Sequence, residues 1–298
     1  MKIYRTTTRV LMISLGLVIA PLSQAAPLPS IGAEAQATAR TPGEDAGSVG
    51  NTGPSTATAA NDASGSGIAD AFASATVGGT ARASSAVESA SGLAETSQAT
   101  ANARWVGHIQ TGGSDPLTPI DIDLDLSVDG TLTYFNNNTN VTLGDLLSSV
   151  TFRMTLHDMA SGATNVFDGS AELTGVSRTE VPVLIRSGDW ADASRYGDFV
   201  EQACSPFSCE VDVNALIRVD DAFTVGFGDV FAVELELATE AFQAQGRETG
   251  AAADFANSAS VSLATDTPGV TLILVPEPTA TLLAVFAAMI ALAPSRRH

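Results

Sequence analysis

Lysine is missing from the whole of residues 26–275, where 9 arginines face 32 acidic residues and leave a net charge of −23. A surface this negative repels nucleic-acid phosphates and anionic lipids, so we expect neither as a partner of the body. It would attract divalent cations or basic surfaces, although the solubility of a secreted protein explains the same charge. The missing lysines therefore exclude classes of partner without naming one.

Cysteine and histidine are also scarce, with two cysteines and three histidines in the chain. In an exported protein, Cys204 and Cys209 predict a disulfide that closes a tight local loop. A zinc site is disfavoured, because only His108 and His157 lie within residues 26–275 to join the two thiols. A loop this short would shape a local turn rather than hold the fold together.

Aromatic residues make up only 6% of the chain, and two of them are tryptophans. Trp105 lies in an alternating stretch and is predicted to be a core residue. Trp190 lies in a polar segment, which makes it the better candidate for an exposed contact that stacks on a sugar ring. Packing at the core or its rim is nevertheless the more common fate of such a residue, and we expect it over an exposed contact for Trp190.

The motifs of common enzyme classes are absent. There is no Gly-x-Ser-x-Gly elbow, no phosphate-binding glycine loop and no His-Glu-x-x-His. His157, followed by Asp158, closes an expected strand and is interpreted as a surface or turn residue. Carboxylates that could pair for glycoside hydrolysis are so numerous that no pair stands out. We therefore predict a protein that is not an enzyme, with a secreted polysaccharide-acting hydrolase as the alternative.

The amino terminus has the features of a signal peptide. Lys2, Arg5 and Arg9 make the first nine positions basic, and residues 10–20 are an apolar run of 11 residues. Small residues then precede the expected signal-peptidase cleavage between Ala25 and Ala26. Because a spanning helix needs roughly 20 residues, the sequence predicts a signal peptide over residues 1–25 rather than a retained anchor.

The carboxyl terminus combines an acidic tripeptide, an apolar segment and a basic end. Pro276, Glu277 and Pro278 cannot join a helix interior or a central strand, so we expect them to stay extended and accessible. Residues 279–293 carry no charge, and as a transmembrane helix they would rise about 22 Å. That is short of a hydrocarbon core of about 30 Å, but snorkelling arginines and local thinning can cover the difference. The arginines behind this helix predict that the body lies on the outer side of the membrane. The alternative for the apolar segment is a buried helix or strand of the core.

This order of parts resembles the PEP-CTERM sorting signal of Gram-negative bacteria, over residues 275–298 only. The same tail is also catalogued after ice-binding proteins, a label that concerns the tail and not the body. The resemblance implies processing near Pro276–Pro278 by an exosortase, a membrane-embedded cysteine transpeptidase-like enzyme. It also implies an inner-membrane precursor whose body passes to the cell envelope or extracellular matrix. A non-catalytic role in binding or supporting extracellular polysaccharide would follow.

Between its ends the chain is predicted to be mainly β. Residues 26–67 are rich in small and polar residues and lack aromatics, which is typical of a disordered, low-complexity leader. Over residues 68–275, many short strands separated by Gly and Asn turns favour one antiparallel β-sandwich. Small residues that alternate over residues 70–106 are interpreted as strands, with an alanine-rich helix as the alternative. Short helices are expected at residues 143–149 and 192–200.

Two further predictions concern residues 120–136. Aliphatic and acidic residues alternate at the start of this stretch, which predicts a half-buried strand with Asp121, Asp123 and Asp125 on one face. The three could hold a calcium ion with a loop carbonyl, although an EF-hand pattern is absent; a solvated face that discourages aggregation is the alternative. Asp129–Gly130 lies between two β-rich stretches and predicts a hairpin turn.

Overall fold

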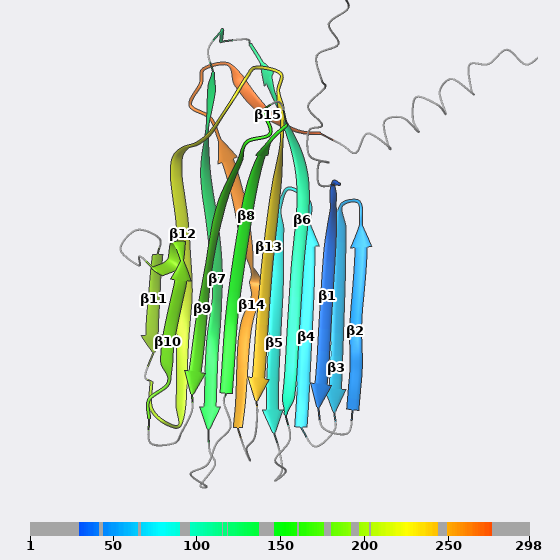
Figure 1. The fold of residues 1–298 in the computed structure, drawn as a ribbon, viewed down its shortest axis with the longest axis vertical. Helices are drawn as coiled ribbons and strands as arrows, with labels where there is room; N and C mark the ends of the chain where they lie inside the picture. Colours follow the sequence, from blue (N-terminus) through cyan, green and yellow to red (C-terminus); the bar gives the residue numbers. More distant parts are fainter. Residues whose placement is uncertain are drawn as a thin grey trace, which may run out of the picture.

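The computed structural model describes residues 30–41, 44–64, 67–89, 96–114, 116–117, 119–136, 146–159, 161–175, 180–191, 197–202, 204–243 and 249–275. Most of these residues lie in two antiparallel sheets that pack face to face (Figure 1). Sheet A contains, in spatial order, β10 (Val183–Gly188), β9 (Thr164–Gly175), β8 (Leu146–Asp158), β13 (Val230–Gln243), β6 (Ser97–Gly113), β1 (Gly32–Thr41) and β2 (Glu44–Gly53), with β15 (Val270–Val275) added to β6. Sheet B contains β11 (Gly197–Gln202), β12 (Ser208–Val225), β7 (Ile120–Asn136), β14 (Thr249–Ala264), β5 (Thr80–Ser89), β4 (Gly67–Thr76) and β3 (Thr56–Ser64). A short 3₁₀ turn, η1 (Asp189–Ala191), follows β10.

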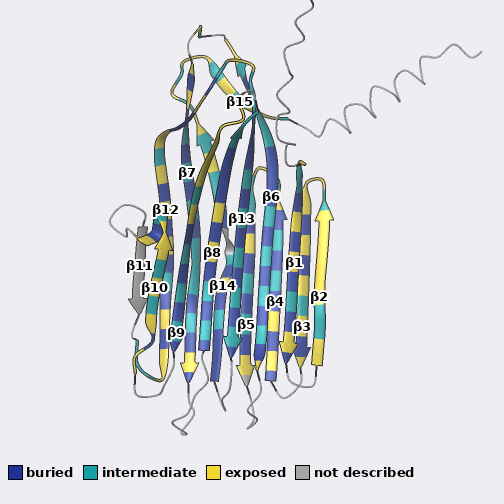
Figure 2. Cartoon of the chain, viewed as in Figure 1, coloured by how far each residue is buried: buried dark blue, intermediate teal, exposed yellow. Residues whose placement is uncertain are grey.

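Alternate residues along the strands are buried between the sheets, as the banding in Figure 2 shows. On β13, for example, Phe231, Leu235 and Leu237 are buried, while Glu234 and Glu236 face outward. A period of two is what a strand produces when one of its faces is covered. The prediction of a mainly antiparallel β fold is therefore confirmed.

One half of the core is lined by alanine. The buried residues of β1, β3, β4 and the first half of β6 are largely alanines, such as Ala35, Ala59, Ala73 and Ala101. Side chains this small let the sheets approach closely, and Cα atoms of β1 and β4 lie within 8 Å of each other, against about 10 Å between typical stacked sheets. The other half holds the large side chains, including Trp105.

The prediction of a disordered leader is wrong for residues 32–64, which form β1, β2 and β3. The composition of β1 and β3 conceals an alternation, because their buried positions are mostly alanines and their outward positions are mostly polar. Each alanine buries little apolar area, but several strands of them together form a continuous core. The sandwich therefore begins near residue 32 rather than at residue 68.

The alanine-rich stretch over residues 70–106 forms β4, β5 and the first part of β6, so the strand interpretation is confirmed over the helical alternative. The two short helices predicted further along are not found in the described residues that they cover. Residues 146–149 begin β8, and residues 197–200 belong to β11. Residues 143–145 and 192–196 lie outside the described part of the chain.

The predicted hairpin at Asp129–Gly130 is also wrong, because β7 runs straight through these residues. Gly130 lies next to an irregularity in β14, where the register with β7 shifts between Asp254 and Ser258. A Cβ atom at position 130 would overlap the ring of Phe255 and lie 2.5 Å from the backbone oxygen of Asp254. The glycine therefore allows a close approach by the neighbouring strand and makes no turn.

The two ends of the described fold meet on one edge of β6. Val275, the last residue of β15, pairs with His108, and Gly32, the first residue of β1, pairs with Val106. Because β13 occupies the opposite edge of β6 as far as Gln110, β15 and β1 lie in line along the same edge. We call this meeting point the seam; Figure 1 shows β15 lying above β1 beside β6.

Candidate functional site

The residues of the two predicted export signals lie outside the described part of the chain. This applies to Ala25 and Ala26 at the expected cleavage site, to Pro276, Glu277 and Pro278, and to residues 279–293. Among the residues that are described, no helix is long and apolar enough to cross a membrane. The sorting prediction therefore stays a prediction.

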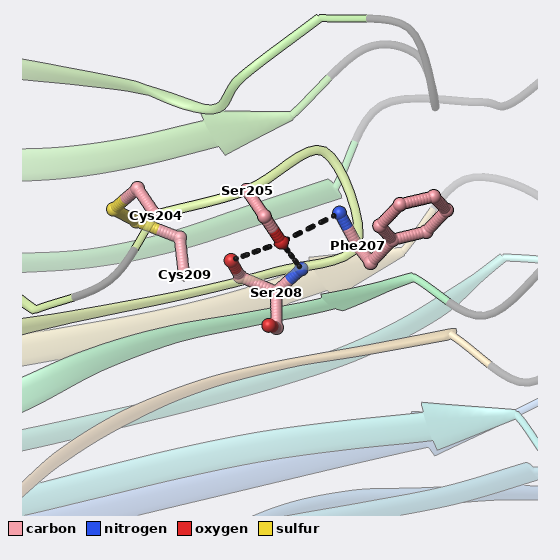
Figure 3. The surroundings of a disulfide bond; sticks show 5 residues. All are labelled: Cys204, Ser205, Phe207, Ser208 and Cys209. Atoms are coloured by element: carbon pink, nitrogen blue, oxygen red, sulfur yellow. Dashed lines mark hydrogen bonds between the residues drawn. A yellow bond between two sulfur atoms is a disulfide. The ribbon is translucent and has the colours of Figure 1, made fainter.

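The predicted disulfide between Cys204 and Cys209 is present (Figure 3). It lies at the start of β12, where Cys209 is buried and the intervening residues form a turn. The hydroxyl of Ser205 accepts hydrogen bonds from the backbone N–H groups of Phe207 (3.2 Å) and Ser208 (3.1 Å). The bridge closes this turn and touches no candidate binding surface.

Asp121, Asp123 and Asp125 lie on the outer face of β7, as the alternation predicts. Each carboxylate contacts a different group of β12 rather than a common centre. Arg218 donates to Asp125 (2.8 Å), the backbone of Asp221 donates to Asp123 (3.0 Å), and the Thr224 hydroxyl donates to Asp121 (2.8 Å).

These contacts hold β12 to β7 on both sides of an irregularity in β12, where the register shifts between Val219 and Phe223. Within the described ranges no group of three or more His, Cys, Asp or Glu side chains could hold a metal ion. The calcium prediction for this strand therefore finds no support, and the three aspartates act as strand-to-strand contacts.

The two histidines of the described residues lie on the outer face of sheet A on either side of Ala232. His108 of β6 and His157 of β8 are both registered with this residue of β13. The Nε2 atom of His157 lies 3.7 Å from a carboxylate oxygen of Glu234. His157 is half-buried on the outward face of β8, which agrees with the surface interpretation.

Both tryptophans are buried, which confirms the prediction for Trp105 and, for Trp190, the packed fate over the exposed contact. η1 places the Trp190 ring 4.6 Å from the ring of Phe152, measured between centroids. A Cβ atom at Gly169 would lie 2.9 Å from the indole, so this glycine makes room for it. The polar neighbours of Trp190 gave no sign of this, because the turn folds the indole back over the end of the core.

On the outer face of sheet A, a polar groove of about 330 Å³ crosses β1, β6, β13 and β8 over Ala238. Both amide groups of its lining donate to other side chains of the protein, and Gln36 donates to the Ser48 hydroxyl at 2.8 Å. Asn102 donates to Glu236 and Gln98, beside the groove, donates to Glu240, each at 2.8 Å.

Arg104 also belongs to this face, where it contacts Glu234 at 2.7 Å and Glu34 at 3.2 Å. The hydrogen bond to Glu234 raises the pKa of the Arg104 guanidinium above its ordinary value. Much of the polar surface of sheet A is thus satisfied internally, and the lining of its groove includes no aromatic residue.

Sheet B carries a different kind of groove on its outer face, with a floor of the smallest side chains. Ala86 of β5 and Gly250 and Ala252 of β14 lie next to one another in register. Around them lie two adjoining hollows of about 370 Å³ and 470 Å³, which share Asp70, Ala86 and Ala252. We call the two together the sheet B trough; it crosses β3, β4, β5, β14 and β7.

The walls of the trough are apolar. Phe135 of β7 and Ile68 of β4 are 47% and 44% exposed and stand on opposite sides of Gly250. Phe72 of β4 is half-buried and lines the adjoining hollow. An exposed aromatic ring beside a floor of alanine and glycine offers a flat apolar surface that a folded protein does not need for its own core.

The rim of the trough is acidic. Asp62 of β3 and Asp70 of β4 are exposed and directly opposite each other in register, and Glu88 of β5 is exposed on the same face. Among the described residues no arginine forms an ion pair with any of the three. Asp254 also lines the trough, but its carboxylate accepts a hydrogen bond from the backbone of Ala256.

Comparison with known proteins returns no family model, no curated protein and no solved structure that matches this chain. Sequence reasoning missed the trough, although a signal was present. Once the strands are known, the outward positions occupied by Ala86, Gly250 and Ala252 mark the place where an outer face must be hollow.

Proposed function

We propose that this is an exported, non-catalytic protein of the cell envelope or extracellular matrix that binds extracellular polysaccharide in the sheet B trough. The observation that carries the proposal is the combination of an apolar floor and wall with an acidic rim. A pyranose ring has one face of C–H groups and a periphery of hydroxyls. Phe135 and the alanine floor suit the C–H face, and the carboxylates of Asp70 and Glu88 suit the hydroxyls as acceptors.

The dimensions of the trough suit a chain rather than a single sugar. Five strands at about 4.8 Å spacing span about 19 Å from the first to the last. The trough lies on an open sheet face rather than in an enclosed cavity, which allows a polymer to continue beyond it at both sides.

The export part of the proposal is supported by the two terminal signals and by the disulfide. The resemblance of residues 275–298 to a PEP-CTERM tail motivates sorting by an exosortase after signal-peptidase cleavage. Disulfides form and persist in oxidising compartments outside the cytosol, so the Cys204–Cys209 bridge agrees with that route.

The binding proposal can be tested with the exported protein and a panel of insoluble and soluble polysaccharides. Phe135→Ala should weaken binding at least about tenfold, because an aromatic contact and its apolar area are lost. Phe207→Ala is the matched control, since Phe207 is 46% exposed but lies in the disulfide turn outside the trough. Absence of binding to every polymer, or equal binding by the Phe135 variant, would refute the proposal.

A secreted hydrolase is the second candidate function, favoured by the opposed carboxylates of Asp62 and Asp70. Glycoside hydrolysis uses two carboxylates that flank the bond to be broken. The assay is release of reducing sugar ends from the polymers that bind. No release would support a binding protein, whereas release that disappears in Asp70→Asn would support the hydrolase.

A further inference from the structure

We infer that the sheet B trough selects a polysaccharide with free amino groups, an amino-sugar polymer that is cationic, over neutral polymers and uronic-acid polymers. This inference rests on the proposed function and names the class of polymer that the trough would take.

The carboxylates of the trough are not neutralised by the protein. Asp62, Asp70 and Glu88 are outside every ion pair formed by the described residues, and no lysine exists in residues 26–275 to provide one. On sheet A, in contrast, Arg104 lies between Glu34 and Glu234 and pairs with both. Glu236 and Glu240 on the same face accept hydrogen bonds from Asn102 and Gln98. Among the described residues, the three carboxylates of the trough have neither kind of partner.

The position of Asp62 opposite Asp70 adds an energetic argument. Like charges directly opposite each other on neighbouring strands destabilise a sheet. The free protein carries this repulsion, and a bound ammonium group would remove it. An anionic uronate would increase the repulsion, and a neutral sugar would leave it unchanged.

An ammonium group fits the trough better than a metal ion does. The described residues provide no group of three or more side chains that could hold a metal, whereas an ammonium group needs only one or two carboxylates and keeps other contacts with water. The floor of Ala86, Gly250 and Ala252 offers no polar side chain to complete a metal shell, but it accommodates the body of a sugar ring.

The test compares three soluble oligosaccharides of similar length with the exported protein: β-1,4-linked glucosamine, its fully N-acetylated counterpart and polygalacturonate. We expect the glucosamine oligomer to bind about tenfold more tightly than the acetylated one at pH 6, as a charge-assisted contact would provide. The preference should shrink as salt screens the charges. Polygalacturonate should not compete.

Asp70→Asn separates binding from folding by moving two readouts in opposite directions. The variant should lose the preference for the glucosamine oligomer, while the melting temperature of the free protein rises because the repulsion with Asp62 is gone. Glu210→Gln is the matched control, since Glu210 is exposed and in the same register row but lies beyond the trough. It removes the same charge and should keep the preference.

The outcomes distinguish the inference from the proposed function. Equal binding of the acetylated and free-amine oligomers, or tighter binding of polygalacturonate, would overturn the inference and leave a polysaccharide-binding protein. A preference that survives in Asp70→Asn would also overturn it, because the selecting charge would lie elsewhere. If no polysaccharide binds at all, the proposed function fails together with the inference.

Discussion

Gly175 of β9 shows how strongly a single glycine can control this core. A Cβ atom at this position would overlap the ring of Tyr134, which reaches across from β7 in the opposite sheet. We predict that Gly175→Ala lowers the free energy of unfolding by about 2 kcal/mol, as overpacking in a core does. Urea denaturation measures the change. Gly50→Ala on edge strand β2 is the control, because its new methyl would meet no atom closer than 3.9 Å; equal losses in both variants would contradict the packing argument.

The environment of Tyr134 makes the stability of the fold depend on pH. Burial raises the pKa of its phenol, against a smaller opposite effect of the hydrogen bond from Asn136. Because the folded state holds this proton more tightly than the unfolded state, its contribution to stability is complete below the ordinary pKa, near 10. That contribution is lost as the pH rises from there through the higher pKa of the folded state.

Tyr134→Phe should therefore reduce the loss of stability that sets in as the pH rises above about 10, because the pKa of Tyr134 is raised in the folded state. Urea midpoints measured for both proteins across that rise in pH provide the test. Parallel curves for the variant and the original protein would show that alkaline unfolding has another origin.

At the scale of single elements, the disulfide turn is a local feature. The chain-entropy estimate for a loop this short predicts that Cys204→Ser with Cys209→Ser costs about 2 kcal/mol of unfolding free energy. Denaturation with and without a reducing agent measures this cost, and the agent should not affect the double variant. Separate unfolding of the two sheets after reduction would show that the bridge does more than close its turn.

The sequence predicted those strands in which apolar and polar residues alternate visibly, such as β7 with its three outward aspartates. It did not predict β1 and β3. Alanine at their buried positions gives little hydrophobic signal, and the composition of these two strands resembles that of a linker. Asp129–Gly130 was misread for a related reason. A glycine can serve a turn or a close approach, and only the position of Phe255 on the neighbouring strand decides which.

At the scale of the whole molecule, the alanine-lined strands are predicted to be indispensable. Deleting residues 32–64 removes β1, β2 and β3 and uncovers the buried faces of β4 and β6. We expect this deletion to abolish cooperative thermal unfolding and to make the protein aggregate, as measured by circular dichroism and size-exclusion chromatography. A deletion variant that melts cooperatively at the original temperature would show that residues 32–64 are a dispensable leader.

The sorting proposal also belongs to this scale. Removing residues 276–298 should redistribute the protein away from the envelope or matrix, because the expected processing site and the apolar segment are both lost. Fractionation of cells and medium with an antiserum against the body measures the distribution. An unchanged distribution, or an entirely cytoplasmic one, would refute sorting by this tail.

The seam beside β6 gives the polypeptide an almost circular path. Val275 and Gly32 are registered with residues of β6 that lie on either side of Gly107, about 7 Å apart along a strand. A short peptide joining Val275 to Gly32 would close the chain without changing the strand pairing of either sheet. The same body could then be opened at a different loop, and its sandwich would keep every strand in its present place.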